Sequence, residues 1–261
     1  MSKESPRNWA TTLDSARRKR GEYNPEMRNF LMHMKDLAKV LVDVSLYPIR
    51  HFYRILVFTQ TYGVSQTFRL SQWADNDFKS PAPNVIKWKV MKRWGGRETW
   101  IETGTYLGET TSQLAKDSEF VISLEPEPTL YKNAQQKFRN SKNIVLLNGT
   151  SELKLREAVF LARQRNLVDM SFWLDGHFSE GLTFLGELEC PVIFELQVIA
   201  EVLSTEEPLT ILIDDVRCFS RTNEVVRGYP SLSYLVNFAD KHNLFWVIEH
   251  DIFIMSNRVK Q

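Results

Sequence analysis

The sequence has few cysteines and no long apolar run, and both absences narrow the class of protein. Only two of its 261 residues are cysteine, Cys190 and Cys218. Two cysteines build no disulfide framework, and no C-x-x-C spacing for zinc occurs. No stretch of 18 uncharged apolar residues is present, which argues against a membrane span. The charged N-terminus is followed by no apolar segment, so we expect no secretory signal and a cytoplasmic protein.

The whole chain is nearly neutral, with a net charge of +1, but its two parts carry opposite charges. Residues 1–99 contain 18 Lys and Arg against 9 Asp and Glu, and the remainder is acidic. A basic arm therefore precedes an acidic domain. The arm either contacts a membrane, a partner or the acidic domain, or is a solvated extension. We expect no nucleic-acid partner, and we leave open a peripheral membrane contact near residues 45–62 and a homo-oligomer contact.

Strand-like and helix-like segments alternate through residues 98–261. The expected strands are 99–104, 120–126, 143–149, 170–176, 209–215, 244–250 and 252–257. One helix is expected to follow the first strand and to end near residue 116. The other expected helices span 128–139, 151–164, 191–203 and 230–242. This alternation predicts an α/β fold with a mostly parallel sheet covered by helices on both faces. A tight turn near Asp251 makes the last two strands antiparallel.

Residues 1–97 are expected to form a mainly helical N-terminal extension. Leu31, Met34, Ala38 and Leu41 recur at helical spacing within the segment 25–61. The sequence SPAPNVIK, residues 80–87, contains two prolines and predicts a linker.

Polar side chains gather where the expected parallel strands end, which is where open α/β sheets bind ligands. In chain order they are Glu102, Gly104, Thr105 and Gly108, then Glu125, then Asn148, Gly149, Thr150 and Ser151, then Asp175, Gly176 and His177, then Asp214 and Asp215. Four of the five strand ends carry carboxylates. This predicts a cation or a hydroxyl-rich ligand that offsets the negative charge.

The loop after the first strand reads ETGTYLGET and lacks a G-x-G-x-x-G motif, which disfavours a nicotinamide-dependent dehydrogenase. Its glycines still allow a tight turn and a close approach to a ligand. Glu125 lies 21 residues past Gly104, at the tip of the second strand, where an acid accepts hydrogen bonds from ribose hydroxyls. The alternative for Glu125 is an acid that stabilises the start of a helix beside Pro126 and Pro128.

Asp214 and Asp215 are adjacent carboxylates after a buried strand, and each disfavours ionisation of the other. With Asp175 from a neighbouring strand, they predict an oxygen-ligand site for Mg²⁺ or Mn²⁺. The alternative is that one aspartate caps a turn and the other pairs with Arg217 or Arg221. His177, two residues after Asp175, is then a candidate general base.

Four segments, WIETGTYLGETT, VISLEPE, WLDGHFSEG and ILIDDV, resemble class I S-adenosylmethionine-dependent methyltransferases, and most of all the Mg²⁺-dependent macrocin-type sugar O-methyltransferases. The resemblance covers roughly residues 98–256 and implies a Rossmann-like seven-stranded sheet with the last strand antiparallel. It implies S-adenosylmethionine at the first three groups of strand-end residues, with Asn148–Ser151 near the adenine, and a metal at Asp175, Asp214 and Asp215. The family motif after the fourth strand has a second aspartate where this chain has His177.

The expected function is methyl transfer from S-adenosylmethionine to a hydroxyl of a sugar-like or other small polar acceptor, with Asp175 holding the metal and His177 taking the proton. The alternative is a non-catalytic methyltransferase-like scaffold whose basic arm binds a membrane or a partner. The acceptor itself is not identified by the sequence.

Overall fold

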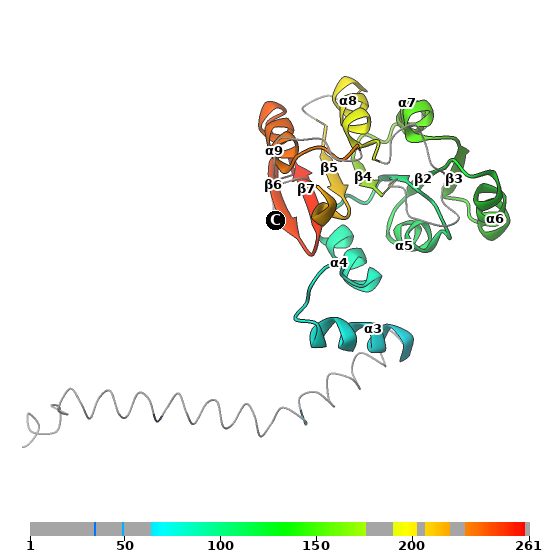
Figure 1. The fold of residues 1–261 in the computed structure, drawn as a ribbon. Helices are drawn as coiled ribbons and strands as arrows, with labels where there is room; N and C mark the ends of the chain where they lie inside the picture. The colour runs from blue at the N-terminus through cyan, green and yellow to red at the C-terminus, as the bar shows by residue number, and fades with distance from the viewer. Residues whose placement is uncertain are drawn as a thin grey trace, which may run out of the picture. The chain divides into compact units, whose positions relative to one another are not determined.

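The computed structural model describes residues 64–175, 190–202, 207–219 and 228–258, together with Met34 and Ile49. The chain divides into two units, residues 1–64 and residues 65–261. Every strand of the described ranges belongs to the second unit (Figure 1). Of the predicted N-terminal helical segment, only Met34 and Ile49 are described, and both are helical; Gly176 and His177 lie outside the described residues.

Seven strands form one sheet. They are β1 Thr99–Thr103, β2 Phe120–Glu125, β3 Ile144–Asn148, β4 Met170–Leu174, β5 Leu209–Ile213, β6 Phe245–Glu249 and β7 Ile252–Ser256. Each begins and ends within two residues of the strand that the sequence predicts.

The helices are α3 Val64–Asp75, α4 Asn84–Trp94, α5 Glu109–Asp117, α6 Pro128–Phe138, α7 Ser151–Arg163, α8 Val192–Val202 and α9 Leu232–Lys241, with a 3₁₀ turn at Val216–Cys218. α6 begins at a proline, which has no N–H to leave unpaired, and the Glu127 carboxylate accepts a hydrogen bond from Leu130 N at 2.6 Å. The sequence predicts that Ser151 caps the helix that ends near residue 164, but Thr150 takes the N-cap position of α7 and Ser151 is its first helical residue.

The strand order is β3-β2-β1-β4-β5-β7-β6. The first five strands run parallel, and β7 pairs antiparallel with both β5 and β6. This order, with its antiparallel last strand, is that of the seven-stranded methyltransferase fold, so the fold prediction is confirmed.

Alternate residues of the central strands face two separate cores, as the period of a strand requires. Ile101, Phe172 and Ile211 pack with α7, α8 and α9 on one face of the sheet. Their chain neighbours Trp100, Trp173 and Leu212 pack with α4 and α5 on the other face. Figure 1 shows these two groups of helices on opposite sides of the strands. Helices on both faces explain why the strands are apolar on both sides.

The prediction of a linker over residues 80–87 is wrong for its last four residues, because α4 begins at Asn84. Val85, Val90, Met91 and Trp94 of this helix are buried. The prolines at 81 and 83 precede the helix rather than interrupt it, a position at which proline is tolerated. Within the described part of the chain, no helix is both long and apolar enough to cross a membrane.

Candidate functional site

The strand order reverses between β1 and β4, and ligands of open α/β sheets bind at such a point. Thr103 at the end of β1 is in register with Leu124 of β2 and with Leu174 of β4. Leu174 is in turn in register with Ile213 at the end of β5. The loops after these strands therefore leave the sheet at one edge, and that edge carries the predicted site residues.

The loop after β1 turns sharply before α5. Gly104, Tyr106 and Gly108 all have positive φ, of +90°, +47° and +68°. A Cβ added at Gly108 would lie 2.7 Å from the Phe138 ring, so this position requires glycine for its backbone angle and for space. The N–H of Gly108 donates to the Thr105 carbonyl oxygen at 2.8 Å, which closes the turn. The loop thus turns tightly at the strand ends although Tyr106 stands where the G-x-G-x-x-G motif has its second glycine.

Glu102 is a buried carboxyl near the end of β1, with an exposed fraction of 1%. Its Oε2 accepts hydrogen bonds from Thr111 Oγ1 at 2.5 Å and Ser123 Oγ at 2.6 Å. Its Oε1 is buried and has no partner among the described residues. Burial raises the pKa of Glu102 to about 7, although both hydroxyls lower it in part. An oxygen without a partner at this place is suited to accept a hydrogen bond from a ligand.

Glu125 ends β2 and is tied to the loop after β1. Its Oε2 accepts from Tyr106 N at 2.7 Å, and its Oε1 accepts from Glu127 N at 3.0 Å. Burial raises its pKa, and the two backbone N–H groups oppose that shift. The side chain that caps α6 is Glu127, and Glu125 contacts this helix start only through the N–H of Glu127. Glu125 therefore joins two loops, and each of its oxygens keeps a lone pair for a further donor.

The turn after β3 lies beside Glu125. Asn148 Nδ2 donates to the Glu125 carbonyl oxygen at 2.8 Å, and Gly149 N donates to the same oxygen at 3.1 Å. Gly149 has a φ of +145°, and Thr150 and Ser151 then lead into α7. The structure thus brings together the first three groups of predicted residues.

A basic residue that the sequence pattern did not indicate, Lys87, lies among the predicted metal ligands Asp175, Asp214 and Asp215. Lys87 of α4 forms an ion pair with Asp214 Oδ2, and its Nζ lies 3.6 Å from Asp215 Oδ1. Burial alone would lower the pKa of Lys87, but the charges of Asp214, Asp175 and Asp215 raise it, so the ammonium stays charged. Burial and the neighbouring Asp214 charge raise the pKa of Asp175 well above its ordinary value.

The predicted metal site does not fit this arrangement. Among the described residues, no group of three or more His, Cys, Asp or Glu side chains is placed to hold a metal ion. The Lys87 ammonium already contacts two of the three carboxylates that would bind the ion, those of Asp214 and Asp215. Arg217 Nη1 donates to Asp215 Oδ1 at 2.7 Å, so the alternative in which an aspartate pairs with Arg217 is confirmed for Asp215.

A cavity of about 250 Å³ opens at this edge of the sheet. It is lined by backbone and side chains of the loop after β1, by Trp173, Asp175 and Asp214 of the sheet, and by side chains of α3 and α4; the residues from these two helices are Arg69, Asn84, Lys87 and Trp88. Trp173 is 1% exposed, and its indole Nε1 has no partner among the described residues. The sequence did not predict that α4 lines the site, because the two prolines before Asn84 indicated a linker there. Val90, Met91 and Trp94 could have revealed it by their helical spacing.

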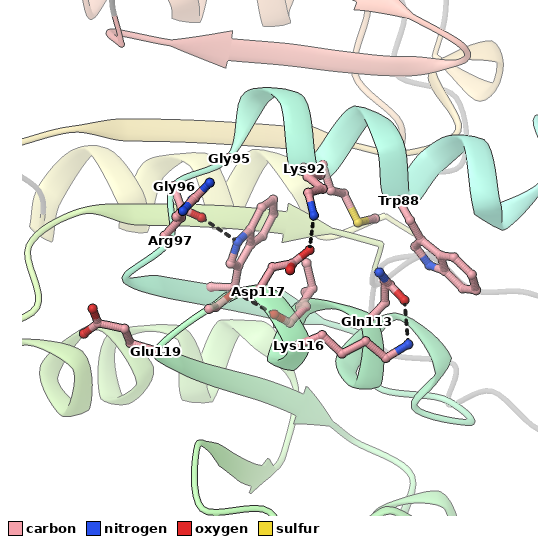
Figure 2. Close-up of a pocket in the computed structure, with 13 residues that line it drawn as sticks. Trp88, Lys92, Gly95, Gly96, Arg97, Gln113, Lys116, Asp117 and Glu119 are labelled. Atoms are coloured by element: carbon pink, nitrogen blue, oxygen red, sulfur yellow. Dashed lines mark hydrogen bonds and ion pairs between the residues drawn. The ribbon is translucent and has the colours of Figure 1, made fainter. Parts of the chain in front are cut away.

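A larger cavity, of about 540 Å³, lies at the opposite ends of the strands, between α4, α5 and the start of β1 (Figure 2). Four of its polar side chains pair with one another: Lys92 Nζ donates to Asp117 Oδ2 at 2.9 Å, and Lys116 Nζ to Gln113 Oε1 at 3.0 Å. It contains none of the strand-end residues. Volume alone would favour this cavity, but the predicted site residues Asp175 and Asp214 line the smaller one.

Comparison with known proteins gives similarity at the level of structure. No protein-family model and no curated protein matches the chain. A putative caffeoyl-CoA O-methyltransferase from Staphylococcus aureus is 13% identical, with a TM-score of 0.45 over 80% of this chain and 98% of that one. SMU.1697c, a putative methyltransferase from Streptococcus mutans in complex with SAH, is 12% identical, with a TM-score of 0.40 over 68% and 97%. The N-methyltransferase NodS from Bradyrhizobium japonicum WM9 is 11% identical, with a TM-score of 0.40 over 67% and 93%. At such values the activity has to be argued from the residues of the site, while the strand order defines the fold.

Proposed function

We propose that this protein is an S-adenosylmethionine-dependent methyltransferase that methylates a hydroxyl of a small polar, sugar-like acceptor. The observation that carries the proposal is the Glu125 carboxylate, held by Tyr106 N at the end of β2 and beside a glycine turn. A carboxylate at the tip of the second strand is where an adenosine ribose is recognised in folds of this kind.

The residues present fit the cofactor. The partnerless Oε1 of Glu102 and the cavity wall formed by Gly104, Thr105 and Tyr106 lie at the same edge as Glu125. Glu102, Gly104, Thr105, Gly108 and Glu125 would hold the methionine and ribose portions, and Asn148, Gly149, Thr150 and Ser151 would surround the adenine. When bound, S-adenosylmethionine supplies a sulfonium methyl group as the electrophile.

The protein's contribution is to position the acceptor and to exclude water. The acceptor oxygen would receive the methyl group with S-adenosylhomocysteine as the leaving group, and the acceptor proton would pass to a base. His177 is the proposed base, and Asp175 lines the cavity that would hold the acceptor. Because attack has to be in line with the breaking bond, much of the rate enhancement comes from orientation. No step is assigned to a divalent cation, since the carboxylates already contact Lys87.

Calorimetric titration with S-adenosylhomocysteine tests the cofactor. We expect binding in about the micromolar range, with the same affinity after treatment with a chelator. A subsequent screen of sugars and phenols with radiolabelled S-adenosylmethionine would then detect labelled ether products. Absence of binding would contradict the proposal and favour the scaffold alternative, in which the basic residues of the N-terminal arm contact a membrane, a partner or a second copy of the chain.

A further inference from the structure

The acidic strand ends predict a nearby cation, and the ammonium of Lys87 is a cation at that place. Lys87 lies on α4, 127 residues before Asp214, and its ammonium pairs with that carboxylate. The same ammonium is 3.6 Å from Asp215 Oδ1, and Lys87 lines the same cavity as Asp175 and Asp214. One cationic group therefore contacts two of the predicted metal ligands and lies in a common cavity with the third.

Burial makes this cation difficult to replace. The side chain of Lys87 is 13% exposed and that of Asp214 is 2% exposed. A metal ion that took over Asp214 would remove the nearest partner of the ammonium in a partly desolvated place, where a weakly paired charge is unfavourable. The pair is thus stable as it stands, whereas a metal would have to displace it.

The second aspartate is also engaged. Asp215 has a left-handed backbone, with a φ of +56°, and its Oδ1 accepts from Arg217 Nη1 at 2.7 Å. Arg217 is held in place in turn by Asp251, whose Oδ1 accepts from Arg217 N at 2.8 Å. Octahedral coordination of Mg²⁺ needs oxygens free to converge on one point. In this chain the side-chain cations Lys87 and Arg217 contact one carboxylate oxygen of Asp214 and one of Asp215.

We propose that Lys87 is the resident cation of this site and takes the place of a divalent metal. The ammonium offsets the charge of the carboxylates and leaves its remaining N–H to face the cavity, where it can hold one acceptor oxygen. Its catalytic consequence rests on the proposed function: methyl transfer should proceed without metal, and the acceptor should not require two vicinal oxygens, because chelation does not hold it.

Manganese binding tests the inference without relying on activity. Purified full-length protein is titrated with Mn²⁺, and free Mn²⁺ is followed by electron paramagnetic resonance. The variants are Lys87→Met, which removes the charge and keeps the chain length, Lys87→Arg, which keeps a cation, and Lys92→Met as a matched control. Lys92 lies on the same helix but pairs with the exposed Asp117.

We expect the wild type, Lys87→Arg and Lys92→Met to leave equimolar Mn²⁺ free. Lys87→Met should gain one Mn²⁺ site, which a second substitution, Asp214→Asn, should remove. Stoichiometric binding of Mn²⁺ by the wild type that is lost on Asp214→Asn would overturn the inference, as would a folded Lys87→Met variant that gains no site. If Lys87→Met does not fold, the wild-type titration still decides.

The same samples separate this inference from the proposed function. Titration with S-adenosylhomocysteine reports cofactor binding independently of Mn²⁺. If the wild type binds neither Mn²⁺ nor S-adenosylhomocysteine, the inference about Lys87 holds and the proposed function is contradicted. If it binds both, the proposed function is supported and the inference is contradicted.

Discussion

The backbone N–H of Tyr106 donates a hydrogen bond to Glu125 Oε2 at 2.7 Å, and this bond joins the loop after β1 to the end of β2. Tyr106 has a φ of +47°, an uncommon angle for a residue with a side chain. The carboxylate therefore holds the loop in this conformation, and the proposed function gives it a second task, which is to bind the cofactor. A substitution at Glu125 should affect both.

Glu125→Gln separates the two tasks, because glutamine keeps one oxygen acceptor but removes the charge. We expect the affinity for S-adenosylhomocysteine to fall by about tenfold or more, since hydrogen bonds to charged groups are worth about 1.5–3 kcal/mol. Calorimetry measures the affinity, and thermal unfolding checks that the fold is retained. Glu157→Gln, on the surface of α7, serves as the control. An unchanged affinity in a stable Glu125→Gln variant would show that Glu125 does not contact the cofactor.

Gly108→Ala should destabilise the protein for two reasons that can be separated. Alanine at a φ of +68° is strained by about 1–2 kcal/mol, and its Cβ would lie 2.7 Å from the Phe138 ring. We expect a lower free energy of unfolding in urea. In the double variant Gly108→Ala with Phe138→Leu, the effects should not add, because the smaller side chain relieves the contact but not the backbone strain. Strict additivity of the two effects would contradict the steric part of this explanation.

The buried carboxyl of Glu195, on α8, should make the stability of the protein depend on pH. The residue is 1% exposed, and neither of its carboxyl oxygens has a hydrogen bond of normal geometry among the described residues. Burial raises the pKa of Glu195 from 4.5 to about 7, although the nearby hydroxyls of Ser151 and Thr103 lower it in part. Between these two pH values the folded protein keeps a proton that the unfolded chain has lost. A rising pH therefore favours unfolding, by at most roughly 3 kcal/mol for this one group.

Glu195→Gln removes this titration. We expect the free energy of unfolding of the variant, relative to the wild type, to increase between about pH 5 and pH 8. Urea unfolding at both pH values measures the difference. Glu201→Gln on the same helix is the control, because Glu201 is exposed and pairs with Arg156. The same difference between variant and wild type at both pH values would mean that Glu195 is ionised in the folded protein.

The strands and most helices could be predicted because their signals are local. Apolar runs such as those of β2 and β5 end in polar residues, and prolines or glycines separate the elements. The strand ends could be predicted for the same reason, since in a parallel sheet the loops at one edge necessarily meet. This is how Glu102, Glu125, Asp175 and Asp214 were found.

Lys87 could not be found in this way, because its partners are distant in the sequence. A lysine on a helix surface is ordinarily solvated, and nothing in the residues around position 87 shows that α4 packs beside β5. The metal hypothesis followed from counting carboxylates without knowing where the cations lie. The roles of the individual site residues, His177 among them, stay predictions that the variants above address.

The ion pair between Lys87 and Asp214 also has a consequence for how this sequence can change over time. A charge that is lost at one of the two positions removes the nearest ionic partner of a buried charge at the other, so substitutions at 87 and 214 should occur together in related chains. A relative that keeps both aspartates but has a neutral residue at position 87 would be one in which a metal ion has taken over the lysine's place. Position 87, which lies ahead of the first strand, would then distinguish two lineages whose strand ends look alike.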